Sequence, residues 1–156
     1  MTDINIRKGT EADLEQVLNL VKELAIYEKA PDEVEVTVAE MHNWGFGKDK
    51  LFEFFVAEHQ HKIVGIALYY YKYSTWKGKC LFLEDIIITE NYRRFGLGSK
   101  LFNEVTLVAK QQQVRRMEWQ VLEWNRSALD FYKKYNAHLD AEWINGKLTY
   151  KQLQVY

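Results

Sequence analysis

The spacing of apolar residues changes several times along the chain and predicts alternating helices and strands. Residues 4–7, INIR, suit a short first strand. In residues 9–29 apolar side chains recur every three or four positions, which predicts an amphipathic helix. Thr10 is its expected N-cap, and Asp13 three residues later completes a variant capping box. A shorter, weaker helix is predicted at residues 37–44.

Beyond residue 50 the pattern shifts toward strands. The stretch LFEFFVAEHQHKIVGIALYYYKY predicts two strands around a His-Gln-His turn, and KCLFLEDIIIT predicts a third strand that is buried over much of its length. The remaining predicted elements are a helix at 98–111, a strand at 116–122, a helix at 126–135 and strand again after residue 137. This order predicts a mixed α/β fold rather than a strict βαβ alternation.

Composition narrows the class of protein. The chain has 156 residues, 47% of them hydrophobic and 28% charged, and no linker or repeat, so a single domain over 1–156 is expected. A net charge of -1 argues against nucleic acid or an anionic membrane as a partner. Cys80 is the one cysteine and, lying among apolar residues, is expected to be buried rather than nucleophilic. His59 and His61 lack a third ligand at suitable spacing, so no metal is expected.

The chain carries no sign of export or membrane insertion. Acidic residues occur near the N-terminus, where a signal peptide would be basic and then apolar. No apolar run approaches the ~18 residues of a membrane span. We therefore expect a cytoplasmic protein.

The segment NYRRFGLGSKLF, residues 91–102, lies between the buried strand and a helix. Gly96 and Gly98 permit a tight turn and a close approach to the backbone, while Arg93 and Arg94 add positive charge. Together with a helix N-terminus these features suit a phosphate group. Walker and dinucleotide-binding motifs do not fit the glycine spacing. By shape alone, a glycine turn that merely caps a helix, with solvated arginines, fits equally well.

This segment also matches the Arg-x-x-Gly-x-Gly/Ala pattern of the GNAT N-acetyltransferases. The stretches YSTWKGKCLFLEDIIITENYRRFGLGSK and VLEWNRSALDFYKKYNA resemble the spermidine/spermine acetyltransferase group, in particular its thialysine-acetylating branch. The resemblance covers nearly the whole chain. It implies a GNAT fold, in which a twisted, mostly antiparallel central sheet contains a splayed parallel pair and is flanked by about four helices.

The resemblance further implies acetyl-CoA as cosubstrate and assigns residues to it. The pantetheine arm of acetyl-CoA would pair with the backbone of Ile86, Ile87 and Ile88. Asn125 and Tyr132 would also contact the coenzyme. The pyrophosphate would bind at a loop formed by Arg93, Arg94, Phe95, Gly96, Leu97, Gly98 and Ser99.

Two residues are candidates for proton transfer. Glu84 belongs to an acidic pair in an apolar strand, where desolvation raises a carboxyl pKa and favours a general base. The alternative is a structural acid paired with a lysine or arginine, or a residue at the end of the strand that faces solvent. Asp85 would face the opposite side of a regular strand. By resemblance Tyr132 protonates the leaving thiolate; a core tyrosine is the alternative. Asn125 lies seven residues earlier, on the same face if both are helical, unless it caps the helix.

The amine pocket is also assigned by resemblance. Tyr27 and Glu28 match amine-binding positions, with a solvated helix end as the alternative for Glu28, and Ser74-Thr75 before Trp76 is typical of the thialysine branch. Related enzymes are homodimers with pockets near the interface. The expected function is direct acetyl transfer to a small primary amine. Polyamine acetylation, protein acetylation and a non-catalytic coenzyme A-binding module remain as alternatives.

Overall fold

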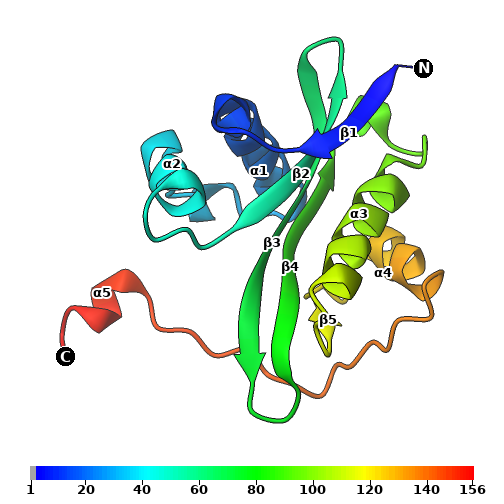
Figure 1. The fold of residues 1–156 in the computed structure, drawn as a ribbon. Coiled ribbons are helices and arrows are strands. Elements are labelled where there is room, and N and C mark those ends of the chain that lie inside the picture. Colours follow the sequence, from blue (N-terminus) through cyan, green and yellow to red (C-terminus); the bar gives the residue numbers. More distant parts are fainter. Residues whose placement is uncertain (1–2) are drawn as a thin grey trace. The chain divides into compact units, whose positions relative to one another are not determined.

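The computed structural model describes residues 3–156 and divides the chain into two compact units (Figure 1). The first unit ends at Trp119, and the second runs from Gln120 to Tyr156. Each unit is described by itself.

The first unit is built on a five-stranded sheet with the order β1-β2-β3-β4-β5. Neighbouring strands from β1 to β4 are antiparallel, whereas β4 and β5 are parallel and pair at Leu81–Met117 and Phe82–Glu118. The predicted mixed sheet with one parallel pair is thus confirmed. The strands are β1 (Ile4–Lys8), β2 (Glu53–His59), β3 (Lys62–Ser74), β4 (Gly78–Ile88) and β5 (Met117–Glu118).

Helices lie on both faces of this sheet (Figure 1). One face is covered by α1 (Leu14–Tyr27) and α2 (Val38–Phe46), whose apolar residues share a core with alternate residues of β2 and β3. The other face is covered by α3 (Leu97–Gln111). This helix lies close to Gly65 of β3, because a Cβ atom added to that glycine would lie 3.3 Å from the Leu101 side chain. This packing explains the three-four spacing of apolar residues in α1 and α3.

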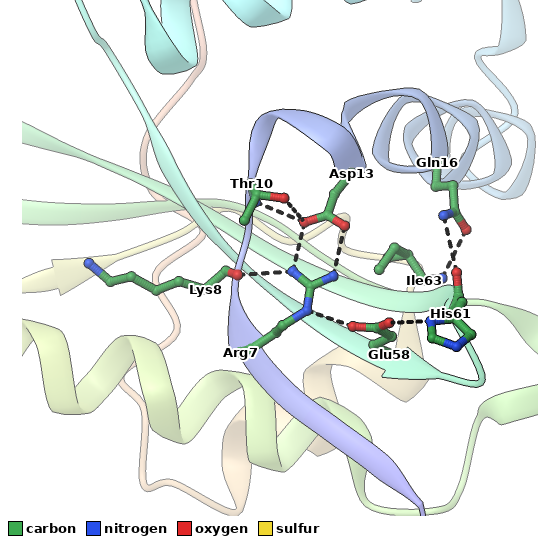
Figure 2. A network of polar contacts seen from close by, with 8 residues as sticks. All are labelled: Arg7, Lys8, Thr10, Asp13, Gln16, Glu58, His61 and Ile63. Carbon is green, nitrogen blue, oxygen red and sulfur yellow. Dashed lines mark hydrogen bonds and ion pairs between the residues drawn. The ribbon is translucent and has the colours of Figure 1, made fainter.

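The entry to α1 is fixed by an arginine that joins three segments (Figure 2). The Arg7 guanidinium donates two hydrogen bonds to the Asp13 carboxylate, at 2.7 and 2.8 Å, and its Nε donates to Glu58 at 2.6 Å. Asp13 also accepts from Thr10, which confirms the predicted capping box, although the box caps a short 3-10 turn that precedes α1. Arg7 holds the pKa of the buried Asp13 below its ordinary value.

The second unit contains α4 (Arg126–Lys133) and the short α5 (Tyr150–Leu153). The helix predicted at 126–135 is therefore confirmed, and the described part of the chain has five α-helices in all. Thr149 starts α5 through a capping box with Gln152.

The strand predicted after residue 137 is absent from the described residues, and of the strand predicted at 116–122 only Met117–Glu118 forms. Both predictions came from local patterns of apolar residues. A strand also needs a neighbouring strand for its backbone N–H and C=O groups, and the structure assigns no strand to residues 138–149. Trp143 and Ile144 accordingly stay 77% and 96% exposed.

Candidate functional site

The glycine loop joins the end of β4 to the start of α3. Gly96 is the N-cap of α3 and has φ 74, in the left-handed region that favours glycine. Gly98 falls in the first turn of α3, where backbone N–H groups lack helical acceptors. The helix begins at Leu97, one residue before its predicted start. This geometry can bind an anion at the N-terminus of a 15-residue helix.

The two arginines of the loop have different surroundings. Arg93 donates from Nε to the carbonyl of Ile88 at 3.0 Å, faces Glu23 at 3.9 Å and lies 5.2 Å from the ring centre of Tyr27. Arg94 has φ 69 and is exposed, and within residues 3–156 its side chain makes no hydrogen bond or ion pair. The side chain of Arg94 is therefore available to a bound anion, whereas that of Arg93 is already engaged.

Strand β4 contains a β-bulge at the acidic pair. Asp85 pairs with Leu68 and Leu83 pairs with Tyr69, which leaves Glu84 as the extra residue. Because Leu68 and Tyr70 lie two positions apart on one face, their partners Asp85 and Phe82 share that face although they are three apart. The prediction that Asp85 faces away from Glu84 assumed a regular strand, and the bulge removes that premise.

Three carboxylates interact at this bulge. Burial, together with the negative charges of Glu84 and Glu28, raises the pKa of Asp85 to about 7. Burial also raises the pKa of Glu28. Glu84 is exposed and accepts a hydrogen bond from the Tyr70 hydroxyl at 3.0 Å. Such a cluster attracts a cation and offers a proton acceptor that titrates near neutral pH.

The end of α1 places Glu28 in this cluster. Glu28 is the C-cap residue, and Lys29 follows with φ 62. The amide of Lys29 donates to Ile26 at 3.1 Å and that of Ala30 donates to Ala25 at 2.8 Å, which is the hydrogen-bond pattern of a Schellman motif. The chain thus turns sharply after α1 and holds Glu28 at its end.

Sequence analysis missed Tyr70 and gave Asp85 little weight. Burial, with the charge of Glu84, raises the pKa of Tyr70 to about 12, so its hydroxyl stays protonated and can donate to Glu84. Tyr70 is one of ten tyrosines, so its residue type alone carries no signal. The position of the bulge would have indicated both residues, but that position depends on how β4 pairs with β3.

Ser74 and Thr75 lie at the tip of the hairpin between β3 and β4, the long green hairpin of Figure 1. Ser74 accepts hydrogen bonds from the amides of Trp76 and Lys77, both at 3.2 Å, and therefore shapes the turn. Gly78 pairs with Ser74, and Glu84 lies six residues further along β4, so about 20 Å separates the tip from the carboxylates. One chain does not bring these predicted substrate residues together.

In the second unit, Asn125 is the N-cap of α4, and its side chain accepts from the amide of Ala128 at 3.2 Å. Asn125 is therefore not helical, which is the alternative left open by the sequence. Tyr132 lies in the last turn of α4 and is 4% exposed, with its ring 5.1 Å from that of Phe131. The hydroxyl of a buried tyrosine usually has a hydrogen-bond partner.

Within residues 3–156, no group of three or more His, Cys, Asp and Glu side chains is arranged to hold a metal ion. In the same range no helix has the length and apolar character needed to cross a membrane. Cys80 is buried, as predicted.

Comparison with known proteins adds a family to this geometry. The model of the acetyltransferase (GNAT) family matches residues 14–137. The thialysine N-epsilon-acetyltransferase of Bos taurus is 37% identical over 145 residues, which cover 88% of this chain and 85% of the bovine protein. A spermidine/spermine N(1)-acetyltransferase-like protein 1 of Homo sapiens is 34% identical over 88% of this chain, but only 21% of its own length is matched.

Solved structures agree on the architecture. An integron cassette protein from Vibrio cholerae superposes with a TM-score of 0.79 over 99% of this chain and 98% of its own, at 19% identity. An aminoglycoside acetyltransferase from a soil metagenomic sample gives 0.77 over 94% and 95%, also at 19% identity. These likenesses concern the fold.

Proposed function

The chain belongs to the GNAT acetyltransferase family and is an N-acetyltransferase; from this premise we propose that it moves an acetyl group directly from acetyl-CoA to a small primary amine. The amine would resemble thialysine or lysine in carrying a cationic group. The observation that carries this choice is the cluster of Glu28, Glu84 and Asp85 at the end of α1 and the bulge of β4.

The coenzyme would lie along the free edge of β4. Within residues 3–119, no strand pairs with β4 beyond Phe82 on the side of β5, so the backbone of 83–87 has no strand neighbour on that edge, while the Ile88 carbonyl accepts from Arg93. An extended pantetheine arm carries amides that can pair there, which supports the roles proposed for Ile86, Ile87 and Ile88. The pyrophosphate would then meet the loop that begins at Arg93 and the N-terminus of α3.

In the proposed mechanism the ammonium group of the substrate binds to the carboxylates and loses a proton to the Glu84–Asp85 pair. The free amine attacks the thioester carbonyl and forms the C–N bond. The C–S bond then breaks, and the leaving thiolate takes a proton from Tyr132. The nitrogen then releases its second proton, which returns Tyr132 to its neutral form and leaves the neutral amide product.

The raised pKa of Asp85 makes the first proton transfer feasible. An alkyl ammonium has a pKa of ~10.4, so transfer to a carboxylate at its ordinary value of 3.8 would be uphill by about 9 kcal/mol. Transfer to a carboxylate with a pKa of about 7 is uphill by about 5 kcal/mol, a moderate part of an enzymatic barrier. We propose that Glu84, as the carboxylate nearest solvent and the amine, accepts the proton, and that Asp85 shares it.

Two copies of the chain would complete the amine pocket. Ser74 and Thr75 lie too far along the β3–β4 hairpin to reach the carboxylates of their own chain, while the same hairpin tip exposes Tyr73 and Trp76 at 77% and 81%. We propose a homodimer in which the tip of one subunit approaches the site of the other. Exposed aromatic side chains of this size are typical of protein interfaces.

The test is acetyl-CoA-dependent release of free thiol with thialysine, lysine, ornithine, putrescine, spermidine and a basic peptide, against a reaction without amine. Preference for thialysine or lysine would support the proposal. Preference for spermidine would replace the substrate by a polyamine, and preference for the peptide would indicate protein acetylation. Binding of acetyl-CoA without thiol release from any amine would contradict catalysis and favour a coenzyme A-binding module.

A further inference from the structure

Arg93 and Arg94 are adjacent in the sequence, and their side chains do different things. The contacts of Arg93 all lead away from the phosphate loop, toward α1 and the end of β4. Arg94 makes none within the described chain and stands exposed in a left-handed conformation. Left-handed backbone is unfavourable for a non-glycine residue, so it persists where the surrounding turn imposes it.

The contacts of Arg93 connect the two halves of the proposed site. Its Nε donates to the carbonyl of Ile88, the last residue of β4, at 3.0 Å. Its guanidinium lies 5.2 Å from the centre of the Tyr27 ring, a cation–π distance. Tyr27 ends α1, and Glu28 of the carboxylate cluster follows directly. Arg93 thus joins the end of the coenzyme strand to the residue beside the amine-binding carboxylate.

Glu23, one turn before Tyr27 on α1, makes the second part of this connection. Its carboxylate accepts from the Thr89 hydroxyl at 2.8 Å and from the Glu90 amide at 3.1 Å, and lies 3.9 Å from Arg93. These contacts bind the middle of α1 to the segment after β4. A single exposed ion pair of this length contributes little, so the junction is held by all these contacts together.

We propose that Arg93 is a positioning residue that sets the affinity for the amine, and that Arg94 is the arginine of this pair that binds the coenzyme's phosphates. The division of roles rests on the proposed function. Arg93 holds the Tyr27 ring and the end of α1 against β4, and so fixes where Glu28 stands relative to Asp85. Glu23 supports the same junction without approaching the coenzyme.

The experiment compares Arg93→Met with Arg94→Met, which remove the same charge and similar bulk one residue apart. Steady-state kinetics with thialysine give KM and kcat, and calorimetry gives the Kd of acetyl-CoA. We expect Arg93→Met to raise the KM for thialysine about fivefold, through loss of the ring contact and one hydrogen bond, with the Kd of acetyl-CoA changed less than about twofold. Arg94→Met should raise that Kd about fivefold, weaken its dependence on salt, and leave the KM for thialysine unchanged.

Two further variants separate positioning from simple charge. Arg93→Lys keeps the charge but loses the planar guanidinium that stacks on Tyr27 while donating from Nε, so it should not restore the KM for thialysine. Glu23→Gln should raise that KM in the same direction and combine non-additively with Arg93→Met. The assignment would be overturned if Arg93→Lys restored the KM for thialysine. It would also be overturned if Arg93→Met raised the Kd of acetyl-CoA as much as Arg94→Met does.

Hydrogen exchange on the protein without ligands provides a readout independent of turnover. Amides of residues 26–30 should exchange at least about threefold faster in Arg93→Met than in Arg94→Met, because only the former loses the contact that holds the end of α1. Equal exchange in both variants would contradict the positioning role. If the wild-type protein transferred acetyl to no amine, the proposed function would fail, while this measurement would still decide whether Arg93 holds α1.

Discussion

Replacing Asp85 by asparagine should change how stability depends on pH. Burial and the charges of Glu84 and Glu28 raise the pKa of Asp85 from 3.8 to about 7. The difference is about 3 units, and each unit corresponds to ~1.4 kcal/mol, so the ionised carboxylate destabilises the fold by at most about 4 kcal/mol. Asp85 keeps partial contact with solvent, which screens part of this effect, and about 2 kcal/mol is the expected size.

The sign follows from proton binding. Between pH 4 and 7 the folded state binds a proton at Asp85 that the unfolded state has already lost, so the stability of the wild-type protein falls as pH rises. Asparagine cannot ionise. The free energy of unfolding of Asp85→Asn minus that of the wild type should therefore increase by about 2 kcal/mol between pH 4 and pH 8.

Urea denaturation at unit steps from pH 4 to pH 8, without substrate or coenzyme, measures this difference. Asp130→Asn, which removes a 69% exposed carboxyl from α4, is the matched control for the loss of one negative charge. A difference between Asp85→Asn and wild type that stays constant from pH 4 to pH 8, or shrinks as pH rises, would refute the assignment of a buried, charge-coupled carboxyl. The result does not depend on catalysis, so it tests the site's electrostatics alone.

Two other variants test the acid and the framework. Tyr132→Phe should lower kcat about 100-fold or more, as expected for loss of a general acid, with little change in the Kd of acetyl-CoA; turnover equal to wild type would remove Tyr132 from the mechanism. Arg7→Met should destabilise the fold by about 2–3 kcal/mol at neutral pH, because Asp13, only 5% exposed, would lose both guanidinium hydrogen bonds. Arg7 lowers the pKa of Asp13, so this loss should shrink in urea denaturation as pH falls below 3.8, and a loss independent of pH would show that packing rather than charge is responsible.

Local pattern predicted most of the first unit because each of its elements carries its own signal. The capping residue Thr10, the spacing in α1 and α3, and the glycine at the start of α3 are all visible in the sequence. The C-terminal segment failed because strand formation depends on a pairing partner that no local pattern reveals. The same limit applied to Asp85, whose direction depends on how β4 pairs with β3.

The bulge at Glu84 also accounts for why the residues proposed to bind the amine and the coenzyme lie together on β4. One extra residue turns Asp85 onto the face that Phe82 occupies, and a bulge bends its strand and increases the local twist. The pairing with β5 ends at Phe82, two residues before Glu84, which is where a stronger twist would carry a parallel neighbour away. A single insertion can thus place the carboxylates beside α1 and open the edge of β4 just beyond them. The backbone left open there is the part that an extended arm would need, so the proton acceptors and the thioester would meet at the same irregularity in the strand.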